Sequence, residues 1–297
     1  MVLSVVNGLC AVLIAVPVAD LANRLYPRLE SPAGVIVTVL FLPLPFVFLT
    51  IPMRDSLSVL LSLTLLAFVA RMLDGDRRVI YPALPLWGCL LLLRPEIAGV
   101  IAVAGGAGVA VRIAQRITRR ALVVRTLFAT GIVSGVFSLL FVGPMLPISS
   151  IERRRAFRAS GGAAYLEGIG YDNWIELVLA TPVRALYFQY APFPFHISSL
   201  FDLVATVMLP ILIVLTVAAY RSARECNRDL AVLVLIVVTY FTGIAGYGLI
   251  DSNFGTTVRH RIPFTFLLCV LAAPTLEQWW DSLTSRIRLF ATVRRSE

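Results

Sequence analysis

The stretch LAVLVLIVVTYFTGIAGYGLI at residues 230–250 contains no charged residue and is long enough to cross a lipid bilayer. About 20 apolar residues in a helix span the roughly 30 Å of hydrocarbon. Because the apolar residues are continuous and do not alternate with polar ones, the stretch predicts a helix and not a barrel strand. Similar blocks fill the chain, which is 59% hydrophobic and only 14% charged. The sequence therefore predicts an all-α, polytopic transmembrane helix bundle.

Nine apolar blocks predict about nine spans. They cover residues 2–22, 33–52, 56–73, 79–93, 97–113, 126–149, 198–220, 230–250 and 262–280. Only Arg94-Pro95-Glu96 separates the fourth block from the fifth, and proline permits a tight turn, so we predict two spans there. One long broken segment is the alternative. We expect a six-span bundle at 1–149, an extracytoplasmic loop with an interfacial helix at 150–197, a three-span bundle at 198–281 and a cytoplasmic basic tail at 282–297.

The arginines predict the orientation in the cell membrane. All 26 basic residues are arginine, and seventeen of them fall in cytoplasmic segments if the amino terminus lies outside and the carboxyl terminus inside. A tenth span at 176–196 is the chief rival, and it would abolish this bias. That stretch contains Arg184, three prolines and several Tyr and Phe residues, which favour the interface. We therefore predict an interfacial helix there.

The composition argues against several classes of function. The four cysteines form no C-x-x-C pair and the chain has two histidines, so we predict neither a metal site nor a disulfide framework. No cofactor is predicted. The net charge of +9 lies mostly in predicted cytoplasmic loops, and no basic stretch sits on a soluble fold, so nucleic acid is not an expected partner. Membrane lipid is the expected partner.

Charged segments meet on the predicted outer side. These are Arg54-Asp55, Arg94-Pro95-Glu96, the loop 150–175 and the segment 251–261. Charges at the membrane edge are costly, which makes them candidates for function. Arg54-Asp55 and Arg94…Glu96 could instead simply pair with each other across the bundle.

The segment 251–261 has the most specific pattern of the four. Asn253 and Thr256 suit a tight turn that caps a helix, and Arg259, His260 and Arg261 follow in its first turn. Arginines beside a helix amino terminus create an anion site. Ordinary snorkelling at the interface is the alternative. We expect Arg259 and Arg261 both to lie at the interface and outside the packed core.

The run from Val5-Val6-Asn7-Gly8 through Arg54-Asp55 to Leu93-Arg94-Pro95-Glu96 resembles the membrane core of GT-C-type glycosyltransferases. These enzymes take sugar from a polyprenyl-phosphate donor. The segments Ala185…Phe195 and Asn253…Arg261 are similar to prokaryotic membrane proteins of surface-polysaccharide synthesis. The resemblance implies an enzyme of envelope glycan assembly that binds a polyprenyl-phosphate-linked sugar and a glycan or lipid acceptor.

Sugar transfer from a lipid phosphate needs a carboxylate base and cations for the departing phosphate. An outward cavity would supply both. Its predicted residues are Asp55 and Glu96 as catalytic carboxylates, Arg94, Arg259 and Arg261 for phosphate, and Arg54, Asn253, Thr256 and His260 in support.

One feature departs from the GT-C pattern. These enzymes usually carry a catalytic acid in the first outer loop, whereas this chain starts in an apolar block and Asp20 falls on the cytoplasmic side. We expect an upstream in-frame segment that encodes one more span and an acidic loop. A lipid-linked oligosaccharide transporter, a polymerase-associated membrane protein and a noncatalytic scaffold are the competing functions.

Overall fold

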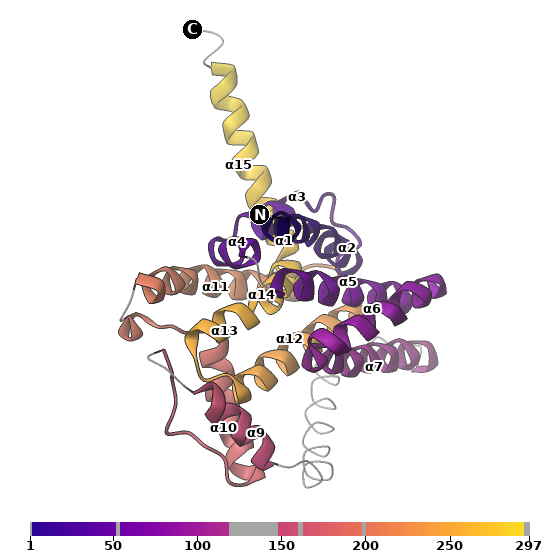
Figure 1. The fold of residues 1–297 in the computed structure, drawn as a ribbon. Coiled ribbons are helices and arrows are strands. Elements are labelled where there is room, and N and C mark those ends of the chain that lie inside the picture. Colours follow the sequence, from indigo (N-terminus) through magenta and orange to yellow (C-terminus); the bar gives the residue numbers. More distant parts are fainter. Residues whose placement is uncertain (1, 52–53, 119–147, 160–162, 198–199, 294–297) are drawn as a thin grey trace.

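The computed structural model describes residues 2–51, 54–118, 148–159, 163–197 and 200–293. Every regular element in these ranges is a helix, which confirms the all-α prediction (Figure 1). Within the described residues, five helices are long and apolar enough to cross a membrane, and up to seven spans result if two bent pairs count as one span each. Most of the predicted span 126–149 lies outside the described residues.

The first half of the chain forms a bundle of successive helices. Leu42 is extended because the following proline disfavours helical backbone at the residue before it, so α3 and α4 meet at 62°. The two helices together occupy the predicted block 33–52. The helices of this half are α1 (Val2–Leu13), α2 (Ala15–Leu25), α3 (Ala33–Phe41), α4 (Pro43–Thr50), α5 (Asp55–Leu73), η1 (Arg77–Val79), α6 (Ile80–Leu93) and α7 (Pro95–Thr118).

Helices α6 and α7 form the hairpin that the Arg94-Pro95 pair predicts. Arg94 leaves helical geometry at φ −149° and ψ 73°, and Pro95 starts α7. The two helices pack against each other, and the Trp87 indole N–H donates to the Ala98 carbonyl at 3.3 Å. The hairpin of two helices is therefore present, but only α7 is long and apolar enough to cross a membrane, so the prediction of two spans stays a prediction.

The second half wraps a fully buried helix. All ten residues of α14 are buried, and the helix packs against α2, α3, α5, α11 and α12. A break of 74° at Ala272 separates it from α15, so the predicted ninth span is two helices. The helices of this half are α9 (Ile148–Arg158), α10 (Trp174–Tyr190), η3 (Pro194–His196), α11 (Leu200–Glu225), α12 (Leu230–Ile250), α13 (Phe254–His260), α14 (Ile262–Leu271) and α15 (Ala273–Val293).

The predicted interfacial helix is α10, which begins at Trp174 and packs along α12. Gly248 permits this close approach, because a Cβ there would lie 2.8 Å from the carbonyl oxygen of Arg184. The Arg184 side chain is fully buried and donates to the Ser252 hydroxyl at 2.9 Å and to the Leu166 carbonyl at 3.0 Å. Arg184 thus ties α10 to the loop before α13.

An ionic belt joins α2, α5, α7 and the start of α12 at one end of the bundle. Each of its members is a side chain at or near a helix end, and each contacts one or two members of opposite charge. The belt consists of Asp20, Arg24, Arg71, Asp74, Arg112 and Asp229. It has three arginines and three aspartates, so its charges balance.

Candidate functional site

A small pocket lies at the other end of the same helices. The start of α5, the α6–α7 turn, the last turns of α12, the last turn of α13 and the start of α14 meet there. The lining residues are Asp55, Ser58, Val59, Arg94, Ile97, Tyr247, Arg259, His260 and Pro263. The free volume is about 10 Å³, close to what one water molecule needs. The pocket as it stands therefore has no room for a sugar ring.

Two arginines hold Asp55. Arg94 donates to Asp55 Oδ1, and Arg259 Nη1 lies 3.8 Å from Asp55 Oδ2. The side chain of Asp55 is almost inaccessible, whereas Arg94 and Arg259 are partly exposed. The contact between Arg94 and Asp55 confirms the pairing across the bundle.

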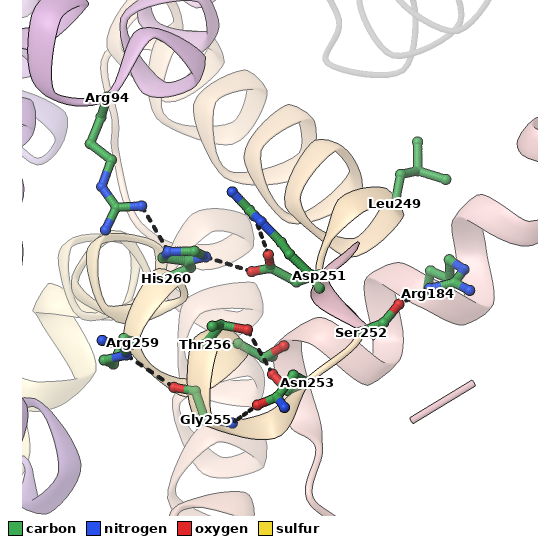
Figure 2. Close-up of polar contacts among 12 residues, drawn as sticks. Arg94, Arg184, Leu249, Asp251, Ser252, Asn253, Gly255, Thr256, Arg259 and His260 are labelled. Carbon is green, nitrogen blue, oxygen red and sulfur yellow. Dashed lines mark hydrogen bonds and ion pairs between the residues drawn. The ribbon is translucent and has the colours of Figure 1, made fainter. Parts of the chain in front are cut away.

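A chain of hydrogen bonds continues from Arg94 to the loop before α13 (Figure 2). Arg94 Nη1 lies 2.7 Å from His260 Nε2, and His260 Nδ1 lies 2.6 Å from Asp251 Oδ2. A guanidinium has no acceptor, so His260 Nε2 must accept and Nδ1 must carry the hydrogen that goes to Asp251. His260 is therefore neutral in this arrangement, and Arg158 holds the second oxygen of the fully buried Asp251.

Tyr247 also lines this pocket. The residue is 3% exposed, and within the described part of the chain its hydroxyl oxygen has no hydrogen-bond partner. A buried hydroxyl without a partner costs about 1–3 kcal/mol. Tyr165 provides the contrast, since its hydroxyl donates to the Asp251 carbonyl at 3.0 Å and contacts the Thr257 hydroxyl at 2.8 Å. Burial raises the pKa of Tyr165, so it stays a neutral donor.

Other predicted residues lie near the pocket without lining it. Glu96, in the first turn of α7, is half-buried, and no cation contacts its carboxylate among the described residues. Arg54 is exposed at the start of α5. Asn253 accepts from the Gly255 N–H at 2.9 Å, and the Thr256 hydroxyl donates to the Asn253 carbonyl at 2.9 Å, so both shape the turn into α13 as predicted (Figure 2).

Arg261 does not join Arg259 in the pocket. It is 3% exposed, and its Nη1 donates to the carbonyl oxygens of Ala191 at 2.6 Å and of Gln189 at 3.3 Å. The expectation that both arginines lie outside the packed core is therefore wrong for Arg261. The physical reason is helical phase, because residues two positions apart on a helix point in nearly opposite directions.

No family model, no curated protein and no solved structure matches this chain. What the site can do must therefore follow from its own charges and geometry. Within the described residues, no group of three or more His, Cys, Asp or Glu side chains could hold a metal ion. The hydrogen bonds and ion pairs instead connect three arginines, Arg94, Arg158 and Arg259, with two aspartates, Asp55 and Asp251. These five contacting residues alone carry one surplus positive charge, which suits a small anion, and the nearby Glu96 carboxylate offsets it when ionised.

Sequence reasoning missed three residues of this arrangement as site residues. Asp251 and Arg158 lie in charged segments that the sequence does point to, but their contact joins residues 93 positions apart. Nothing in the sequence marks Tyr247 as a site residue, because a tyrosine near the end of an apolar block is typical of the membrane interface.

Proposed function

We propose that this chain is a GT-C-like membrane glycosyltransferase of envelope glycan assembly, which transfers sugar from a polyprenyl-phosphate donor. The phosphate binds at the pocket, where Arg94 and Arg259 contact its oxygens and the Tyr247 hydroxyl donates a hydrogen bond. The observation that carries the proposal is this unpartnered, buried hydroxyl beside a surplus of positive charge. A phosphate oxygen can accept the hydrogen bond of the hydroxyl and interact with the positive charge at the same time.

Glu96 is the base of this proposal, and Asp55 is a positioning residue. Arg94 donates to one carboxylate oxygen of Asp55 and Arg259 lies near the other, so both oxygens already face a cation. The Glu96 carboxylate contacts no cation among the described residues and lies two residues along the chain from Arg94. It is therefore the carboxylate that can take the acceptor proton while the arginines stabilise the departing phosphate.

The proposal includes a topology of nine spans, with the amino terminus outside and the pocket facing outward. Seventeen of the 26 arginines then lie inside. In a cysteine-free background, Phe157→Cys and Thr256→Cys should react with an impermeant thiol reagent added to intact cells, whereas Thr118→Cys should react only after permeabilisation. Outside labelling at position 118 would overturn the topology.

Phosphate binding is tested with purified protein in detergent and a fluorescent polyprenyl phosphate. Arg259→Ala removes a charge-assisted hydrogen bond, worth about 1.5–3 kcal/mol, so we expect at least a tenfold weaker affinity. Arg94→Lys should also weaken binding, because lysine lacks the planar fork. Arg54→Ala, an exposed arginine outside the pocket lining, is the matched control. If Arg259→Ala and Arg54→Ala bind equally well, the phosphate site is refuted.

Catalysis is tested separately from binding. Glu96→Gln should bind the polyprenyl phosphate as wild type does and lose sugar transfer to an acceptor. A variant that transfers sugar at the wild-type rate would exclude Glu96 as the base.

The pocket volume favours a second candidate, a noncatalytic scaffold. A space of about 10 Å³ admits neither a sugar nor a phosphate group, so phosphate binding and sugar transfer both require the pocket to open. A scaffold, or a lipid-linked oligosaccharide transporter, would keep its cellular function in the Glu96→Gln variant. Complementation of a deletion strain by this variant therefore separates these functions from the enzyme.

A further inference from the structure

The last helix leaves the bundle after its first two turns. Helix α15 is anchored there by two hydrogen bonds, from the Gly34 N–H to Glu277 Oε2 at 2.8 Å and between the Thr275 and Ser222 hydroxyls at 2.7 Å. Gly34 starts α3 and Ser222 lies in the last turns of α11. The Tyr26 hydroxyl, just after α2, also donates to the Leu271 carbonyl at 2.6 Å. The helix thus departs at the end of the bundle that carries the ionic belt.

The direction of α15 differs from that of the bundle. It bends by 74° from α14, and Figure 1 shows it extending away from the other helices toward the carboxyl terminus. Helices α5, α7 and α12 connect the two charged ends of the bundle. A helix that turns this sharply away at the belt level runs along the membrane face.

The free part of α15 is amphipathic. Trp279, Leu283 and Ile287 follow one another at intervals of four residues and are 48%, 52% and 58% exposed. Intervals of three and four residues place side chains on one helix face. Asp281 and Ser285 are exposed on the opposite face. No described element covers the apolar stripe beyond the first turns of the helix.

We propose that α15 lies in the plane of the interface and binds the surface of an anionic lipid bilayer through its apolar stripe. Adjacent tryptophans, Trp279 and Trp280, are the residues that membrane interfaces favour. Arg286 is exposed, and the sequence continues with Arg288, Arg294 and Arg295. Basic residues beside an apolar stripe complement acidic headgroups. This proposal depends on membrane location and is independent of the pocket and its chemistry.

Spin labels on the full-length protein test the orientation. Leu283→Cys and Ile287→Cys report the apolar stripe, and Asp281→Cys and Ser285→Cys report the polar face, each in a cysteine-free background in vesicles of phosphatidylcholine and phosphatidylglycerol. We expect positions 283 and 287 to be accessible to oxygen at one shared depth of about 5–10 Å. Positions 281 and 285 should be accessible to an aqueous nickel complex.

Three outcomes would overturn the in-plane helix. A label at 287 that is about 6 Å deeper than one at 283 would mean that α15 continues across the membrane. Nickel accessibility at all four sites would mean that the helix lies in water. Spin–spin broadening at 283 and 287 that disappears on dilution with unlabelled protein would mean that the stripe binds a second copy of the chain.

The lipid charge is tested by Arg286→Gln. One arginine near an anionic surface is worth about 1 kcal/mol, so the ratio of membrane-bound to water-exposed label at position 283 should fall about fivefold. Vesicles of phosphatidylcholine alone should lower this ratio for the unmodified helix as well. Arg77→Gln, at an exposed arginine outside α15, is the matched control and should leave the ratio unchanged. A ratio that changes neither in Arg286→Gln nor with the lipid charge would refute the anionic partner.

Discussion

Removal of the side-chain hydroxyl should lower the stability of the protein at Tyr165 and leave it unchanged or raise it at Tyr247. In Tyr165→Phe, the Asp251 carbonyl and the Thr257 hydroxyl both lose a buried partner. Such a loss costs about 1–3 kcal/mol of unfolding free energy. In Tyr247→Phe, no hydrogen bond within the described residues is lost and one unsatisfied hydroxyl is removed. We expect this variant to be as stable as wild type or more stable.

The measurement is unfolding of both variants in mixed detergent micelles by titration with a denaturing detergent, followed by circular dichroism. Polyprenyl-phosphate binding is then measured under native conditions. Tyr247→Phe should bind about threefold to tenfold more weakly, because one hydrogen bond to the phosphate is worth about 0.5–1.5 kcal/mol. The combination of unchanged stability and weaker binding identifies a hydroxyl that serves the ligand.

The reasoning is refuted if Tyr247→Phe loses as much stability as Tyr165→Phe. The Tyr247 hydroxyl would then already have a partner in the free protein, and its place in the phosphate site would have no basis. Equal binding by wild type and Tyr247→Phe would also remove it from that site.

Three further predictions concern the packing around the site. Arg261→Ala should unfold well before Arg259→Ala, because only Arg261 is buried, and thermal unfolding in detergent checks this order. Gly34→Ala should shift or release α15, since the added Cβ would lie 2.4 Å from the Leu276 carbonyl oxygen. Cross-linking between α3 and α15 should therefore change in this variant. Gly99→Ala, whose added Cβ meets nothing within 4 Å, should cross-link as wild type does. Glu152 accepts from Arg155, which lowers the pKa of Glu152. Its contribution to stability is therefore present above the ordinary glutamate pKa and lost as the pH falls through the lowered one, which hydrogen exchange of residues 166–171 should show as faster exchange in acid.

The convergence of charged segments was predictable from the apolar blocks. Once α5, α7 and α12 are recognised as spans, the turn at Arg94, the start of α5 at Asp55 and the loop before α13 must lie at one end of the bundle. The structure brings Asp55, Arg94, Arg259 and His260 into one pocket. The sequence could not give the partners within that set, because several arginines and carboxylates were available at the same level.

Other features were not predictable from hydropathy because burial in protein and burial in lipid select the same residues. Helix α14 is apolar throughout and buried throughout, although it has only ten residues. The block 262–280 therefore looks like a span, while its chain bends at Ala272. Pro274 was the local signal for this break, since it has no N–H to donate to the preceding turn.

The two charged ends of the bundle differ in a way that separates anchoring from binding. Asp55 and Asp74, at opposite ends of α5, are about 28 Å apart at 1.5 Å per residue, which matches the thickness of the hydrocarbon core. Both ends therefore suit ion pairs at a membrane face. The belt around Asp74 pairs three arginines with three aspartates. The chain of contacts around Asp55 pairs three arginines with two aspartates and contains the unpartnered hydroxyl of Tyr247. Because Arg112 Nε of the belt also has no hydrogen-bond partner within the described residues, an unpartnered polar atom does not separate the two ends. The excess of one arginine among the contacting residues around Asp55 does separate them, and it is the feature that suits the proposed phosphate.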